Sequence, residues 1–272
     1  MKYISYLIAV ILFFGVAEAK AESVDLELVL AVDVSRSVDA TEAKLQRDGY
    51  IAALRDPRVH AAIKSGFNRK IAVLYLEWAG YGNTHIAVNW SSIANLDDAN
   101  KFIAQLIKAE PVSASRTSIS GAIESAIPLF DNNGYEGERR VIDISGDGPN
   151  NTGPLVTVAR DAALKRGITI NGLPILDDKP SFGYPAIVNL DLYYENCVIG
   201  GNGAFVVVAE NFTAFGEAIL RKLILEIAAR PMQGHPSSHV LYGQRLPRML
   251  IADKRTPPPC DIGELQWRRM VQ

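Results

Sequence analysis

Apolar stretches of strand length recur along the chain, and segments with helical spacing separate them. Residues 25–33 (DLELVLAVD) first alternate and then become continuously apolar, which is typical of a central strand buried on both faces. Residues 85–90 follow a glycine-containing turn and are predicted to return as a hairpin partner of the strand before them. The other predicted strands are residues 71–78, 139–145, 168–176 and 203–209.

Predicted helices lie between these strands. One begins near residue 38, breaks at Pro57 and continues to residue 63; the others cover residues 97–109, 117–130, 155–166 and 212–229. Gly167 stands at a position typical of a left-handed helix cap. Strands that alternate with helices require crossover connections, so the predicted fold class is α/β, with a Rossmann-like, mostly parallel central sheet and helices on both faces.

The two ends of the chain differ from this pattern. Residues 4–16 are almost wholly apolar, and 17–19 and 19–21 both offer the small-x-small pattern that a signal peptidase needs. We therefore expect a signal peptide at residues 1–21, a periplasmic or secreted mature protein, and no stable membrane span after cleavage; a retained anchor is the alternative. The folded domain is predicted at residues 22–230. Residues 231–272 are proline-rich and are predicted to be a tail of uncertain order.

Composition adds little to this picture. The hydrophobic content of 48% and the charged content of 21% are ordinary for a globular protein, and the net charge of −2 offers no attraction for nucleic acid. Cys197 and Cys260 suit an oxidising compartment, where they could form a disulfide; the alternative is a buried Cys197 and a free Cys260 thiol.

Three polar clusters follow predicted strands or precede a predicted helix. Asp33, Ser35 and Ser37 come directly after the first buried strand, Thr117 stands at a helix entrance, and Asp147 follows the strand at residues 139–145. Ligands of parallel sheets bind beyond the carboxyl ends of the strands. Two carboxylates and three hydroxyls suit a hard cation and leave a coordination position open. Each residue alone could instead be a helix cap or a turn residue.

Together these clusters resemble the metal-ion-dependent adhesion site of von Willebrand factor A domains. The resemblance covers residues 23–229, and the strings SGDGPNN (145–151) and CVIGGNGAF (197–205) are similar to a bacterial, secreted branch of unknown function. It implies that Asp33, Ser35, Ser37 and Thr117 bind the metal directly and that Asp147 acts through water. The implied cofactor is Mg²⁺, or Mn²⁺ or Ca²⁺ in its place. Gly146 departs from the family pattern, since many members carry threonine or serine there.

The other candidate residues have less support. Glu77 lies near the end of the predicted strand at residues 71–78, close to the same sheet edge, and could join the site, while Asn150 and Asn151 lie beside Asp147. The chain has no HExxH or paired Cys/His spacing for zinc, no G-x-S-x-G motif and no Walker-type lysine loop.

The resemblance implies ligand recognition rather than catalysis. The leading hypothesis is an exported, non-enzymatic binding module whose protein partner supplies an aspartate or glutamate to the metal. One alternative is a Mg²⁺-dependent phosphoester hydrolase. A phosphoaspartyl enzyme usually has a second aspartate two residues after the first, where this chain has Ser35. The other alternative is a metal-free structural interaction domain.

Overall fold

The computed structural model describes residues 20–176, 187–229, 239–241 and 255–270. Within these ranges a seven-stranded sheet has the order β4–β3–β2–β6–β7–β8–β9. Only β4 runs antiparallel to its neighbour, so the prediction of a mostly parallel sheet with one hairpin partner is confirmed. The strands are β2 (Leu26–Asp33), β3 (Ile71–Trp78), β4 (Thr84–Ile93), β6 (Arg140–Gly146), β7 (Ile168–Pro174), β8 (Phe205–Val207) and β9 (His239–Leu241).

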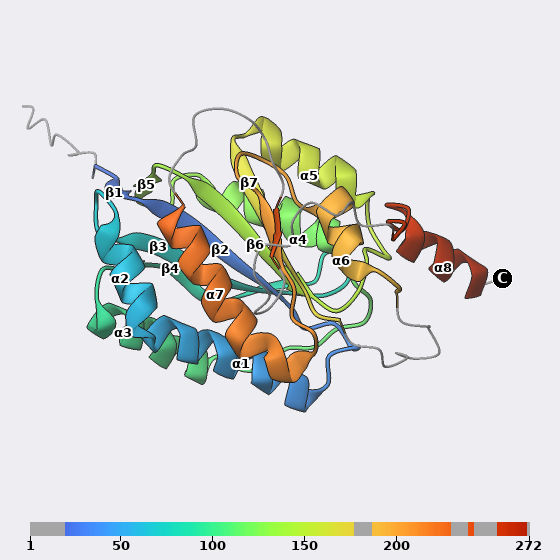
Figure 1. Ribbon diagram of the computed structural model, residues 1–272, viewed down its shortest axis with the longest axis horizontal. Helices are drawn as coiled ribbons and strands as arrows, with labels where there is room; N and C mark the ends of the chain where they lie inside the picture. Colours follow the sequence, from blue (N-terminus) through green and yellow to red (C-terminus); the bar gives the residue numbers. More distant parts are fainter. Residues whose placement is uncertain (1–19, 177–186, 230–238, 242–254, 271–272) are drawn as a thin grey trace, which may run out of the picture.

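Helices cover both faces of this sheet (Figure 1). The side chains of β2 alternate between two hydrophobic cores, with Leu28 in one and Val29 in the other, which explains why its sequence is continuously apolar. The first core receives residues from α1 (Ala40–Arg55), α2 (Pro57–Ser65), α3 (Leu96–Lys108) and α7 (Phe215–Ala228). The second receives residues from α4 (Ile119–Ala126), α5 (Val156–Lys165), α6 (Leu190–Tyr193) and the π-helix η2 (Tyr194–Val198).

Several short elements were not predicted. The strands β1 (Glu22–Val24) and β5 (Tyr135–Gly137) pair in parallel as a separate ribbon. The predicted helix at 117–130 begins at Ile119, because the Ser118 side chain caps it, and ends as the 3-10 helix η1 (Ile127–Phe130). A second 3-10 turn, η3 (Phe212–Ala214), precedes α7.

The segment predicted as a tail contains regular structure. It includes β9 and the helix α8 (Ile262–Met270), which lies beyond α6 at the edge of the molecule in Figure 1. Cys197 and Cys260 form a disulfide, with their Cα atoms 5.4 Å apart, so the first of the two alternatives for these cysteines is correct. The disulfide joins η2 to the residues just before α8.

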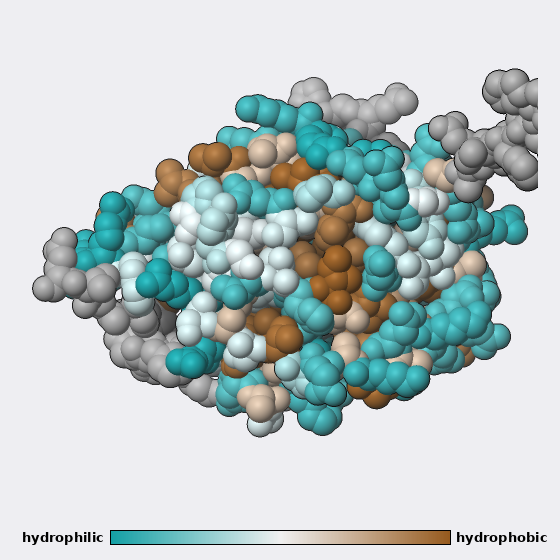
Figure 2. Space-filling view, turned by 180° about the vertical axis from the view of Figure 1, so that it is seen from behind, coloured by the Kyte–Doolittle hydropathy of each residue, from teal (hydrophilic) through white to brown (hydrophobic). Residues whose placement is uncertain are grey.

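Residues 1–19 of the predicted signal peptide lie outside the described residues, as do residues 231–238, 242–254 and 271–272 of the predicted tail. Over the part of the chain that is described, no helix is long and apolar enough to span a membrane. Figure 2 shows that the face opposite to the view of Figure 1 is largely hydrophilic, with a strip of hydrophobic residues near its middle.

Candidate metal centre

The candidate site lies where two central strands end side by side. Asp33 is the last residue of β2, Gly146 is the last residue of β6, and Val32 pairs with Ser145 just before them. The strands are parallel, so their carboxyl ends meet at one edge of the sheet, where such folds bind ligands. The side chain of Asp33 is fully buried there.

A chain of hydrogen bonds connects four of the five predicted ligands. The amide of Ser35 donates to Oδ1 of Asp33 at 2.7 Å. The hydroxyls of Ser35 and Ser37 lie 2.9 Å apart, and the Ser37 hydroxyl donates to Oδ1 of Asp147, also at 2.9 Å. Residues separated by more than one hundred positions are thus brought together by the fold.

Thr117 belongs to an adjoining loop that is tied to both other loops. Ser35 forms an isolated bridge with Ala114. The amide of Thr117 donates to the side chain of Asn151 at 2.9 Å, and the amide of Asn151 donates back to the Thr117 carbonyl at 2.9 Å. Asn151 therefore fixes the threonine loop against the loop that carries Asp147.

Arg116, directly before Thr117, has a φ of 71°. This left-handed conformation is uncommon for a residue with a side chain and costs free energy that the surrounding contacts must offset. The structure therefore holds this loop in a conformation that the sequence alone does not favour.

The electrostatics of the site are unfavourable for two ionised carboxylates. Burial and the nearby charge of Asp147 raise the pKa of Asp33 well above its ordinary value, against hydrogen bonds from Ser35 and from the backbone of Asp147. Oδ2 of Asp33 is buried and has no hydrogen-bond partner. A divalent cation would remove both deficits, because it attracts the two carboxylates and occupies free lone pairs.

Tyr194 is a neighbour of this site that the sequence analysis missed. Its hydroxyl is buried without a hydrogen-bond partner. Burial, followed by the charges of Asp33 and Asp147, raises the pKa of Tyr194, so the hydroxyl is a neutral donor at physiological pH. A Cβ atom on Gly146 would lie 3.0 Å from this hydroxyl and 2.9 Å from Oδ2 of Asp33. The glycine that departs from the family pattern thus makes room for a tyrosine.

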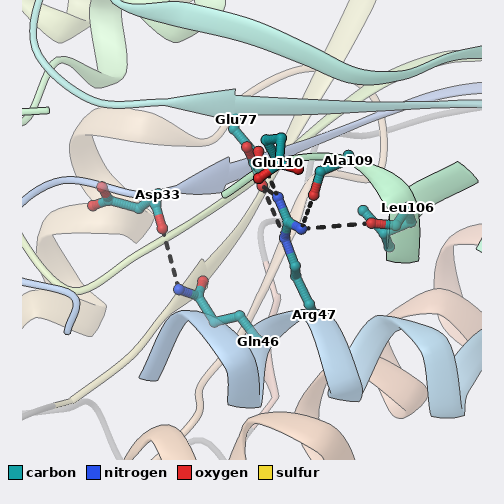
Figure 3. A network of polar contacts seen from close by, with 7 residues as sticks. All are labelled: Asp33, Gln46, Arg47, Glu77, Leu106, Ala109 and Glu110. Atoms are coloured by element: carbon teal, nitrogen blue, oxygen red, sulfur yellow. Dashed lines mark hydrogen bonds and ion pairs between the residues drawn. The ribbon is translucent and has the colours of Figure 1, made fainter. Parts of the chain in front are cut away.

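Glu77 forms an ion pair with Arg47, although it lies one residue before the end of β3. Its Oε1 accepts hydrogen bonds from Arg47 at 2.6 and 3.1 Å, and Arg47 also donates to the carbonyl of Ala109 at 2.7 Å (Figure 3). The carboxylate is therefore neutralised by an arginine of α1. From the preceding position of the same helix, Gln46 donates to the Asp33 carbonyl at 3.1 Å and fixes the end of β2.

The C-terminal helix α8 contacts two loops of the site. The guanidinium of Arg116 lies 3.9 Å from the ring centroid of Trp267. Asn150 donates to Oε1 of Glu264 at 2.7 Å, and it also accepts from the Ser120 amide at 2.9 Å. These contacts reach the residue before Thr117 and the loop after Asp147, so α8 supports the site from outside.

The donors assembled here are oxygen atoms only. The described residues contain no group of three or more His, Cys, Asp or Glu side chains that could hold a metal. A metal at this place would depend on two carboxylates, three hydroxyls and water, which is a donor set suited to Mg²⁺ or a similar hard cation.

The sequence of residues 23–231 matches the model of a family described as "Protein of unknown function (DUF1194)". Comparison with curated proteins gives no match.

Solved structures show the same fold. Proximal thread matrix protein 1 from the mussel byssus, with a zinc-occupied MIDAS motif, has a TM-score of 0.53 and 14% identity over 77% of this chain and 47% of its own. A pilus adhesin, SpaC from Lactobacillus rhamnosus GG, has a TM-score of 0.53 and 13% identity over 77% of this chain and 31% of its own. A von Willebrand factor type A structure from Catenulispora acidiphila has a TM-score of 0.49 and 12% identity over 76% of this chain and 43% of its own.

The chain therefore spans less than half the length of these structures. At such identities the likeness concerns the fold alone. The fold is similar to that of the mussel protein and the pilus adhesin, and the α/β class with a mostly parallel central sheet agrees with the sequence prediction.

Proposed function

The chain belongs to the DUF1194 family, and we propose that it is an exported binding module that holds a divalent metal ion and captures an acidic group of a partner protein through it. The observation that carries this proposal is Oδ2 of Asp33, a buried carboxylate oxygen without a hydrogen-bond partner beside a second carboxylate. Burial of an unsatisfied charge is costly, so such an arrangement is expected mainly where a cation binds.

Each of the five residues has a role in this proposal. Asp33 and Asp147 supply the negative charge, and the hydroxyls of Ser35, Ser37 and Thr117 supply neutral donors. A cation held by so few charges remains electrophilic and can accept a carboxylate oxygen from outside. The structures similar in fold support this choice, since one carries a zinc-occupied MIDAS motif and another is a pilus adhesin.

Binding is favoured over catalysis because the site offers no evident general acid or base. Ser35 stands where a phosphoaspartyl enzyme would place its second aspartate, and Glu77 is bound by Arg47. The partner is proposed to be a protein that presents an aspartate or glutamate, and the compartment is proposed to be the periplasm or the cell exterior.

Calorimetric titration of the mature protein with Mg²⁺, Mn²⁺ and Ca²⁺ tests the metal site. We expect binding of at least one of these ions and an increase in unfolding free energy of about 2.7 kcal/mol at one hundred times Kd. Asp33→Ala should abolish both effects. Asp48→Ala is the matched control, because Asp48 lies on α1, is exposed and pairs with Lys44.

Wild-type protein that shows neither heat of binding nor a change in melting temperature at millimolar ion concentrations would refute the metal site. A phosphoester assay separates the two functions. Hydrolysis above a metal-only control that disappears in Asp33→Ala would replace the binding module by an enzyme.

A further inference from the structure

Two buried oxygen atoms without hydrogen-bond partners flank Gly146. One is Oδ2 of Asp33, and the other is the hydroxyl oxygen of Tyr194. They lie 2.9 and 3.0 Å from the position that a Cβ atom of residue 146 would occupy. A side chain at residue 146 would crowd both atoms, so glycine leaves room for them beside the end of β6.

A second glycine, Gly172, makes room for the ring of Tyr194. Gly172 of β7 pairs with Ile144 of β6, two residues before Gly146 and on the same face of the sheet. A Cβ atom on Gly172 would lie 2.8 Å from the ring of Tyr194. The ring thus extends along the sheet from Gly172, and its hydroxyl reaches the strand end at Gly146.

Tyr194 belongs to a segment with an uncommon backbone conformation. Tyr194 is the first residue of the π-helix η2, and such helices are rare and occur frequently at functional sites. The same short helix contains Cys197, whose disulfide to Cys260 anchors it. The backbone that delivers Tyr194 is therefore held covalently.

The hydroxyl of Tyr194 is costly where it lies, because a buried hydroxyl without a hydrogen-bond partner is less stable than it would be in water. Phenylalanine has no hydroxyl, so it would be more stable than tyrosine at residue 194 if packing alone decided. The Asp33 carboxylate lies on the same glycine as this hydroxyl, and its Oδ2 lacks a donor.

In the structure neither of these two oxygen atoms has a hydrogen-bond partner. We propose that Tyr194 is a positioning residue of the metal centre: when a cation binds, its hydroxyl donates a hydrogen bond to the Asp33 carboxylate and holds it in the orientation that the cation requires. The proposal rests on the proposed function, because it assigns a role toward the same metal. Residues that orient metal ligands in this way typically change metal affinity by about 10- to 100-fold when they are removed.

The test compares the Mn²⁺ affinity of wild type, Tyr194→Phe and Tyr75→Phe by calorimetry. Tyr75 is the matched control, because its hydroxyl is also fully buried without a partner but lies in the other core. We expect Tyr194→Phe to bind Mn²⁺ about 10-fold or more weakly. We also expect the melting temperature of metal-free Tyr194→Phe to stay the same or rise. A purely structural hydroxyl would not combine weaker binding with equal or greater stability.

The results separate a positioning role of Tyr194 from a purely structural one. Weaker binding in Tyr194→Phe together with wild-type binding in Tyr75→Phe supports the positioning role. Equal binding in wild type and Tyr194→Phe overturns it while leaving the metal site intact. An equal loss in both variants also overturns it, since the loss would then follow from any buried hydroxyl. A wild type that binds no metal refutes the metal site itself and the positioning role with it.

Discussion

At the scale of residues, the core contains a buried charge cluster that is separate from the candidate metal site. Lys222 of α7 forms ion pairs with Asp143 of β6 and with Glu226, and all three side chains are almost completely excluded from solvent. Asn171 donates to Glu226 at 3.0 Å. One ammonium faces two carboxylates, so the cluster is more easily buried when one carboxyl group is protonated.

This cluster predicts a pH dependence of stability. Burial, followed by the charge of Glu226, raises the pKa of Asp143 to about 7, against the attraction of Lys222. The folded state therefore holds a proton that the unfolded state releases near pH 4. The stability from this proton is fully present below about pH 4 and is lost as pH rises through about 7.

Asp143→Asn should remove this dependence, because asparagine cannot ionise. In urea unfolding between pH 5 and 8, the wild type should lose on the order of 1 kcal/mol per pH unit relative to the variant until about pH 7. Asp161→Asn is the control, since Asp161 is an exposed partner of Arg160 and should matter little at any pH. Parallel curves for wild type and Asp143→Asn would contradict the assignment.

Some residues of the candidate site could be predicted from the sequence, but Tyr194 could not. Asp33, Ser35 and Ser37 are consecutive alternate positions after an apolar strand, so their proximity follows from local sequence. Tyr194 lies in a π-helix, and two glycines of different strands leave room for its ring and its hydroxyl. The two glycines and the π-helix produce no periodic pattern of apolar residues in the sequence. The one hint in the sequence was Gly146, which departs from the family pattern.

At the scale of elements, the length of each strand or helix decided whether it could be predicted from the sequence. The strand at residues 71–78 has the predicted bounds, and β2 differs from its prediction by one residue, because long apolar runs carry a strong signal. The three-residue strands β1 and β5 and the four-residue helix α6 are shorter than the windows over which a strand or helix pattern can be recognised. The helix α8 lies in a proline-rich segment, and its position depends on non-local contacts with Asn150 and Arg116.

The disulfide that fastens α8 yields a second prediction. Cys197 and Cys260 are 63 residues apart in sequence, so their link removes many conformations of the unfolded chain. Cys260→Ser should lower the unfolding free energy by roughly 2–5 kcal/mol, measured by denaturant unfolding. Because α8 also rests on the loops of Thr117 and Asp147, we expect limited proteolysis to release residues 255–270 faster in the variant.

Reductant provides the internal control for this experiment. It should destabilise the wild type to the level of Cys260→Ser and leave the variant unchanged. A wild type whose unfolding is indifferent to complete reduction, checked by thiol counting, would show that the link contributes nothing to stability.

At the scale of the whole molecule, the start of the folded domain is compatible with either predicted cleavage site. The amide of Glu22 donates to the carbonyl of Gly134 at 2.8 Å, and β1 pairs with β5 from Glu22 onward. Removal of residues 1–19 or 1–21 would leave this ribbon complete. A disulfide between Cys197 and Cys260 is also the kind of bond that persists in an exported protein.

Export can be tested with a single substitution, because both possible cleavage sites share one residue. Ala19 is the last residue of the pattern 17–19 and the first of the pattern 19–21, so Ala19→Arg removes a required small residue from both. In a cell fractionation, wild type should appear outside the cytoplasm with Lys20 or Glu22 at its N-terminus, and Ala19→Arg should stay in the membrane fraction with Met1. Lys20→Ala is the control, since it leaves every small residue in place and should be processed normally. Wild-type protein that keeps Met1 in the membrane fraction would instead establish residues 4–16 as an anchor, and the proposed binding module would then act at the membrane surface.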